Sequence, residues 1–199
     1  MYTIINGSPK VINSNSSYFI NIITKNLDKC NIFELKEGNY NNIINGINKS
    51  KTIIFAFPLY VDSPTSVTLS FLDYIIDNEI TLKNKSVYSI INCGFREGEQ
   101  NITALNIIKN WCEKVGSTYK GSILIGAGEI VGKKKYRFIS NKAIKSLKEF
   151  SNIIKEDNAK EIITTMDLLN DKLYCILANL SWNKKGRINN LTKKELKIE

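Results

Sequence analysis

Short apolar segments alternate with amphipathic segments along the chain up to Lys155, and this alternation constrains the fold more than any other feature. Two of the apolar segments, TIIFAF and SVYSIIN, are rich in β-branched and aromatic residues, which is typical of strands covered on both faces. A strand–helix series of this kind predicts a parallel sheet with helices on both faces. The predicted strands are residues 2–6, 31–35, 52–57, 86–92 and 122–126.

The segments between these strands carry apolar residues at helical spacing. In the third of them, Val67, Phe71 and Ile75 share one face, and Ser63-Pro64 offers an N-cap followed by proline at the first helical position. The predicted helices begin at Ser16 and near Pro64, and cover residues 40–49 (more weakly), 105–115 and 140–155.

The strand–helix repeat ends at about Asn158. Two strand orders suit five such units, and the short first crossovers favour the order 2-1-3-4-5. Beyond the repeat, residues 159–180 look helical and a basic tail runs from Trp182 to Glu199. A length of 199 residues suits one domain. We therefore expect the sheet domain over 1–157 and, over 158–199, an appendage of the same domain that forms a helix pair or a dimer contact.

The formal charge of +9 comes mainly from lysine, because only Arg96, Arg137 and Arg187 among the 28 basic residues are arginine. Bidentate recognition of phosphates and bases favours arginine, so we expect no nucleic-acid partner. No apolar run approaches the roughly 20 residues that span a bilayer. The N-terminus enters a strand without a basic leader or cleavage site. These features predict a cytoplasmic protein without a membrane partner.

The chain contains no histidine, and its four cysteines are scattered. The lack of histidine removes Ser–His, Cys–His and His–metal mechanisms together. No C-x-x-C pair is present, so neither a zinc knuckle nor a compact iron–sulfur motif fits, and we expect no metal site. The expected thiols are free and reduced: Cys30, Cys93, Cys112 and Cys175.

The loop after the first strand, residues 7–16, is rich in Gly, Ser and Asn and leads into a helix. Hydroxyl groups and the backbone N–H groups of a helix N-terminus converge on anions. The loop matches neither the P-loop nor the G-x-G-x-x-G pattern, and it has enough donors for a monophosphate. These donors belong to Ser8, Lys10, Ser14, Asn15 and Ser16.

Two further loops should lie beside the first, because ligands of such sheets bind beyond the carboxyl ends of the strands where the strand order reverses. In residues 58–63, Tyr60 could cover a planar ring with Leu59 as an apolar wall, and Asp62 either orients a polar group or caps the next helix. In residues 92–101, Asn92 could bond the polar edge of such a ring.

The same third loop contains Cys93, Glu97 and Glu99, which invite a catalytic interpretation. Without histidine or another assigned base nearby, Cys93 is expected to be an inert small residue. The two glutamates are interpreted as solvated loop charges. No side chain is therefore predicted to be catalytic.

Taken together, the three loops resemble those of the flavodoxin-like NAD(P)H-dependent FMN reductases. Asn6-Gly7-Ser8-Pro9-Lys10 with Ser14-Asn15-Ser16 is similar to their phosphate loop, G-S-P-R followed by S-N-T. Residues 57–63 resemble their second flavin loop, and residues 92–95 with Glu99 and Asn101 resemble their third. The resemblance extends over about residues 1–126.

This resemblance implies a flavodoxin-like fold, a non-covalent FMN and chemistry at the flavin N5 atom rather than at a side chain. Lys10 stands where the family more often has arginine, which keeps the charge and loses the bidentate fork. The implied phosphate-binding residues are Ser8, Lys10, Ser14, Asn15 and Ser16, and those along the ring are Pro58, Leu59, Tyr60, Val61, Asp62, Asn92, Cys93, Gly94 and Phe95.

The leading hypothesis is an FMN-dependent NAD(P)H oxidoreductase, a homodimer that passes a hydride from nicotinamide to FMN and on to a small acceptor. Quinones, flavins, nitro compounds and azo compounds all remain open as acceptors. The alternative is a flavodoxin-type electron carrier without substrate turnover, and a third possibility is a scaffold that binds no flavin. The basic balance and the C-terminal segment argue against the carrier. The basic stretch 133–137 matches no motif of the family.

Overall fold

The computed structural model describes residues 1–10, 13–36, 38–132, 139–167, 170–192 and 194–196. It contains two compact units, Met1–Thr165 and Met166–Glu199. The basic stretch 133–137 lies outside the described residues.

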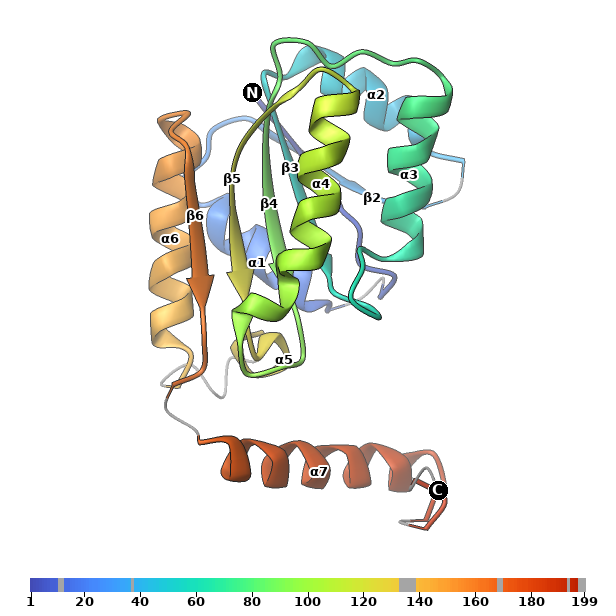
Figure 1. Cartoon of the computed structure of the whole chain (residues 1–199), viewed down its shortest axis with the longest axis vertical. Helices are drawn as coiled ribbons and strands as arrows, with labels where there is room; N and C mark the ends of the chain where they lie inside the picture. Colours follow the sequence, from blue (N-terminus) through green and yellow to red (C-terminus); the bar gives the residue numbers. More distant parts are fainter. Residues whose placement is uncertain (11–12, 37, 133–138, 168–169, 193, 197–199) are drawn as a thin grey trace. The chain divides into compact units, whose positions relative to one another are not determined.

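One parallel sheet forms the centre of the first unit, with strand order β2-β1-β3-β4-β5-β6 (Figure 1). The first five strands follow the predicted order 2-1-3-4-5, so the predicted doubly wound α/β fold is confirmed. The strands are β1 (Tyr2–Asn6), β2 (Cys30–Glu34), β3 (Thr52–Pro58), β4 (Ser86–Asn92), β5 (Thr118–Ile125) and β6 (Lys160–Thr164).

The sixth strand corrects the prediction of a five-stranded sheet and of a helix from residue 159. Lys160–Thr164 pairs in parallel with Gly121–Ile125 of β5. The sequence Lys-Glu-Ile-Ile-Thr has two good helix formers at its start and shows no clear alternation. Its strand conformation follows from pairing with β5, which local propensity does not reveal.

Helices cover both faces of the sheet. Ile43 of α2, Phe71 of α3 and Ile108 of α4 belong to one buried cluster with β1, β3 and β4, whereas α1 and α6 pack together on the other face. In Figure 1, α3 and α4 lie in front of the sheet and α1 lies behind it. The first unit contains α1 (Asn15–Ile23), α2 (Tyr40–Lys49), α3 (Ser66–Asp77), the 3-10 turn η1 (Gly98–Asn101), α4 (Ile102–Lys114), α5 (Gly128–Val131) and α6 (Asn141–Lys155).

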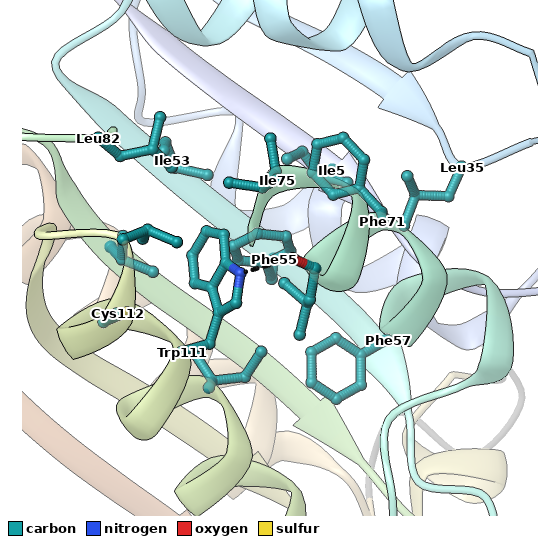
Figure 2. Close-up of a cluster of buried hydrophobic side chains, with 14 of the residues drawn as sticks. Ile5, Leu35, Ile53, Phe55, Phe57, Phe71, Ile75, Leu82, Trp111 and Cys112 are labelled. Carbon is teal, nitrogen blue, oxygen red and sulfur yellow. Dashed lines mark hydrogen bonds between the residues drawn. The ribbon is translucent and has the colours of Figure 1, made fainter. Parts of the chain in front are cut away.

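Aromatic side chains fill the centre of the larger cluster (Figure 2). Trp111 packs edge-to-face on Phe55 with ring centroids 5.4 Å apart, and its indole N–H donates to the Leu72 carbonyl at 3.0 Å. The one polar atom of this buried ring is thus satisfied, as burial requires. This packing fixes α3 and α4 against the strands that carry the loops discussed below.

The second unit contains α7 (Asp171–Ile188), capped by Asn170, whose side chain accepts from the Leu173 N–H at 2.9 Å. This helix confirms the later part of the predicted helical segment. The helices of the described ranges include none that combines the length and the apolar character needed to cross a membrane.

Candidate functional site

The carboxyl ends of β1, β3 and β4 are adjacent, so the loops that follow them leave the same edge of the sheet. Gly7 N–H donates to the Ala56 carbonyl at 2.9 Å, and Leu59 N–H donates to the Asn92 carbonyl at 2.7 Å. These bonds continue the strand pairing into the loops. The three predicted loops therefore begin side by side, as the sequence indicated.

Asn6, the last residue of β1, organises the first loop from a fully buried position. Its Oδ1 accepts from Ser8 N–H at 3.1 Å, and its Nδ2 donates to Ser17 Oγ at 2.9 Å and to Glu34 Oε1 at 3.0 Å. The sequence pattern alone predicts no separate role for Asn6 or Ser17. An asparagine at the end of a buried strand could nevertheless have indicated such a role, because a buried amide needs several polar partners.

The serines of the loop are held at the first turn of α1. Ser14 caps the helix, its Oγ accepting from Ser17 N–H at 3.0 Å and lying 2.7 Å from Ser17 Oγ. The buried Ser16 Oγ accepts from Asn92 Nδ2 at 3.4 Å, so the third loop reaches the first. Asn92 therefore faces the helix N-terminus rather than solvent.

The remaining predicted residues of the first loop differ in exposure. Ser8 is buried and its Oγ accepts from Lys10 N–H at 3.4 Å, whereas the Lys10 side chain is exposed. Asn15 is half-buried beside Gly132, where an added Cβ would overlap its Oδ1. The backbone N–H groups of Asn15 and Ser16 belong to the first turn, which leaves its donors without intrahelical partners.

Gly7 brings the first loop against the start of α3. Thr65 Oγ1 donates to the Gly7 carbonyl at 2.6 Å, and a Cβ added at Gly7 would overlap Thr68 Oγ1. Thr65 also accepts from Thr68 N–H at 3.4 Å and is the N-cap of α3. The predicted cap at Ser63 is wrong, because Ser63 belongs to the turn that precedes this helix.

That turn spans residues 60–63 of the second loop. Tyr60 and Ser63 exchange backbone hydrogen bonds of 3.0 and 3.1 Å. Val61 and Asp62 between them have φ values of 49° and 55°, as in a type I′ turn. Positive φ is unfavourable for a β-branched residue, so Val61 is strained. Asp62 lies in the turn and does not cap α3.

Three apolar side chains of the second and third loops face solvent: Tyr60 is 51% exposed, Val61 99% and Phe95 54%. Leu59 and Pro58 are half-buried behind them, and Gly94 is exposed. Exposed apolar side chains of this size are often found at contact surfaces of proteins.

Cys93 of the third loop is turned away from this surface. Its side chain is buried, and its Sγ lies 3.4 Å from the Glu97 carbonyl and 3.7 Å from the Phe95 carbonyl. Burial raises the pKa of the Cys93 thiol to about 11, so the thiol stays protonated at neutral pH. This environment fits the interpretation of an inert residue and does not present the thiol to a ligand.

The acidic side chains of the third loop also have structural partners. Glu97 pairs with Arg96 at 2.9 Å, and Glu99 accepts from Thr165 Oγ1 at 3.2 Å. Within the described parts of the chain, no cluster of three or more His, Cys, Asp or Glu side chains could hold a metal ion.

A fourth segment, the turn after β5, supports the third loop and was missed in the sequence. Ala127 N–H donates to the Phe95 carbonyl at 2.5 Å, and Gly128 N–H donates to the Cys93 carbonyl at 2.8 Å. An added Cβ at Gly126 would overlap the Arg96 carbonyl oxygen. The Gly-Ala-Gly sequence directly after a strand was the available signal.

A groove of about 700 Å³ lies elsewhere, between α1 and α6, and is lined by Tyr18, Ile22, Lys25, Ile144 and Lys148 among others. It shares no lining residue with the three loops. The candidate site is therefore defined by the converging loops and not by this groove.

No protein-family model and no curated protein matches the chain. Solved structures do match. The Trp repressor binding protein from Bacillus subtilis superposes with a TM-score of 0.62 at 16% identity, over 75% of this chain and 96% of the other. An NADPH-quinone reductase from P. pentosaceus superposes with a TM-score of 0.61 at 14% identity, over 76% of this chain and 97% of the other. Fusobacterium nucleatum flavodoxin bound to flavin mononucleotide superposes with a TM-score of 0.59 at 14% identity, over 79% of this chain and 98% of the other. The chain therefore has a flavodoxin-like fold.

Proposed function

We propose that the chain is an FMN-dependent NAD(P)H oxidoreductase. The observation that carries the proposal is the convergence of three different surfaces at one edge of the sheet. These are the hydroxyl-rich first turn of α1, the strained turn with Tyr60 and Val61, and the glycine-containing loop with Phe95. Two proteins of the same fold support this proposal: one is an NADPH-quinone reductase, and the other is a flavodoxin bound to flavin mononucleotide.

The residues of the first loop fit a phosphate group. The backbone N–H groups at the N-terminus of a helix can bind anions, and the helix dipole favours negative charge there. The first turn of α1 offers such a position. Ser8, Ser14 and Ser16 would donate hydroxyl hydrogens, Asn15 its amide, and the exposed Lys10 would supply charge. The phosphate would thus be held without an arginine fork.

The second and third loops fit the ring. Tyr60, Val61 and Phe95 would cover apolar surface of the isoalloxazine, and backbone groups of residues 92–95 would bond its polar edge. When bound, FMN supplies the hydride-accepting and electron-passing chemistry. Residues of the three loops would orient the group, and the buried, protonated Cys93 thiol would take no part in the chemistry.

We infer that NAD(P)H is the hydride donor and that a quinone, flavin, nitro or azo compound is the acceptor. The net charge of +9 favours an anionic nucleotide by long-range attraction. The likeness to an NADPH-quinone reductase supports a quinone among these acceptors. The likeness to flavodoxins keeps the electron carrier as a second candidate, since it has the same fold.

We propose that the protein is a homodimer. The support is an apolar stripe on α7, where side chains at helical spacing are between 43% and 59% exposed: Leu173, Ile176, Leu177 and Leu180. Sedimentation velocity over a range of concentrations tests this. A single monomeric species at all concentrations would contradict the dimer.

The experiment for the function begins with reconstitution. Purified protein is mixed with FMN or riboflavin, and binding is followed by quenching of flavin fluorescence. We expect FMN to bind far more tightly than riboflavin, because only FMN carries the phosphate. Equal affinities would refute the phosphate site.

The holoprotein is then mixed anaerobically with excess NADH or NADPH. A reductase loses its flavin absorbance rapidly with one of the two nucleotides, and adding an acceptor restores it. A protein that binds FMN but is bleached by neither nucleotide is the carrier.

A further inference from the structure

The groove between α1 and α6 has no role in the proposed function, although its volume of about 700 Å³ is that of a small-molecule site. Both of its walls belong to the first unit, in which α1 and α6 pack together. Its apolar lining comes from Tyr18 and Ile22, which are half-buried, and from Ile144, which is 7% exposed. The groove therefore offers apolar contact surface to a ligand that does not compete for the three loops.

The charged side chains of the groove all have the same sign. Lys25, just beyond the end of α1, and Lys148 of α6 line it, and no acidic residue that the structure describes does so. Glu149, which follows Lys148 in the sequence, pairs with Lys160 at 2.6 Å. Neither Lys25 nor Lys148 has an acidic partner within the described ranges of the chain. Two like charges beside one groove repel each other and together attract an anion.

Side-chain hydrogen bonds tie the two walls of the groove together. Asn26 Nδ2 donates to Ser151 Oγ at 3.2 Å and also to Asn152 Oδ1. Ser151 is 1% exposed, and its Oγ donates to the Lys148 carbonyl at 2.6 Å. Asn152 Nδ2 has no acceptor among the residues that the structure describes, so it stays available as an N–H donor. The lining thus combines two ammonium groups and an amide donor on segments that are bonded to each other.

We propose that this groove binds a small organic anion that combines an apolar body with a carboxylate or sulfonate group. The anionic group lies between Lys25 and Lys148, where it relieves their repulsion and accepts from Asn152 Nδ2. The apolar body packs on the apolar lining of the groove. Exposed ion pairs alone are weak, so tight binding requires both parts of the ligand. The site is independent of the proposed function, since it shares no lining residue with the three loops.

Three probes separate the charge from the apolar contact: 2-naphthoate, its uncharged amide 2-naphthamide, and acetate. Binding to the full chain is followed by ¹H–¹⁵N NMR at about 0.15 M salt, which screens distant charges. We expect saturable shifts with 2-naphthoate that are largest in residues 18–26 and 144–152. The other two probes should bind about tenfold more weakly, because each lacks one of the two parts. Shifts that are largest in the three loops or in α7, or equal binding of the amide, would overturn the proposal.

Two further measurements separate this inference from the alternatives. Saturating FMN should leave the dissociation constant of 2-naphthoate unchanged, and competition between the two would place the probe at the loops and overturn the proposal. If FMN does not bind at all, the proposed function fails and the groove is still tested. Spectra without a ligand are recorded at several protein concentrations. Concentration-dependent shifts at the groove would show that a second copy covers it, which would also overturn the proposal.

Charge reversal at one wall provides the matched comparison. K148E should weaken binding of 2-naphthoate about 3- to 10-fold, because one attraction becomes a repulsion, and should leave binding of 2-naphthamide unchanged. K145E is the control, since Lys145 is exposed on the same helix outside the groove lining and the charge change is equal. It should alter neither affinity by more than about twofold. Equal effects of the two variants, or none of K148E, would refute the site. K25E repeats the test on the other wall and decides if K148E does not fold.

Discussion

Replacing Gly7 by alanine should destabilise the protein for a steric reason that can be located. An added Cβ would overlap Thr68 Oγ1 and would lie 3.2 Å from Phe57 Cβ and 3.3 Å from Thr68 Cβ. Forcing one extra methyl group into such packing costs about 1–3 kcal/mol. Alanine has a lower conformational entropy than glycine in the unfolded chain, and this difference stabilises the folded state by about 0.4–1 kcal/mol. At the midpoints of these two ranges, the net loss of unfolding free energy is about 1 kcal/mol.

Urea unfolding monitored by circular dichroism measures this loss as a lower midpoint at constant slope. The double-mutant cycle with T68A provides the control, because removing Thr68 Oγ1 clears the space that the new methyl group needs. G7A should then cost about 1 kcal/mol less in the T68A background than in wild type. An unchanged midpoint for G7A, or additive effects in the cycle, would refute the proposed contact between the first loop and α3.

Three further predictions concern other parts of the chain. V61N should raise the unfolding free energy by about 1 kcal/mol in urea titrations, since asparagine tolerates the positive φ of the turn better than valine; a lower value would mean that Val61 is not strained. The pKa of the Cys93 thiol is raised from 9.0 to about 11, so the unfolded thiol ionises first and stability falls as pH rises through this window. Between pH 9 and 11, the unfolding free energy of C93A should fall less steeply than that of wild type, by up to about 1.4 kcal/mol per pH unit. Equal slopes for the two proteins would contradict a raised pKa of the buried Cys93 thiol. Residues 1–165 alone should unfold cooperatively with a native circular dichroism spectrum, because they form a compact unit, whereas a chain without a thermal transition would show that this unit depends on the rest.

The spacing of apolar residues predicted the helices and strands that pack into the core, because that spacing can be read from residues close together in the sequence. The stripe of Val67, Phe71 and Ile75 on α3 is an example, and the strand order followed from the crossovers. β6 was not predicted because its conformation depends on pairing with β5, a distant segment. The cap at Ser63 was wrong for a related reason, since the backbone pairing of Ser63 with Tyr60 depends on a strained turn.

The candidate site was predicted loop by loop but not in its hydrogen bonding. Ser14 and Ser16 were interpreted as ligand donors, and their bonds to Ser17 and Asn92 became visible only in three dimensions. Asn6 escaped notice because its three partners lie 2, 11 and 28 residues away. Distances of this kind carry no periodic signal.

The sixth strand also determines which strand forms the edge of the sheet beside β5. Because β6 pairs along Gly121–Ile125, the backbone of β5 is bonded on both sides, and Gly126 N–H is held by the Thr164 carbonyl at 2.9 Å. Edge strands open locally more readily than central ones, and the edges of this sheet are β2 and β6. The turn after β5 that supports the third loop thus lies one strand inside the β6 edge. Opening of β6 would therefore break the bond from Gly126 N–H to Thr164 but leave the bonds from Ala127 and Gly128 to the third loop in place.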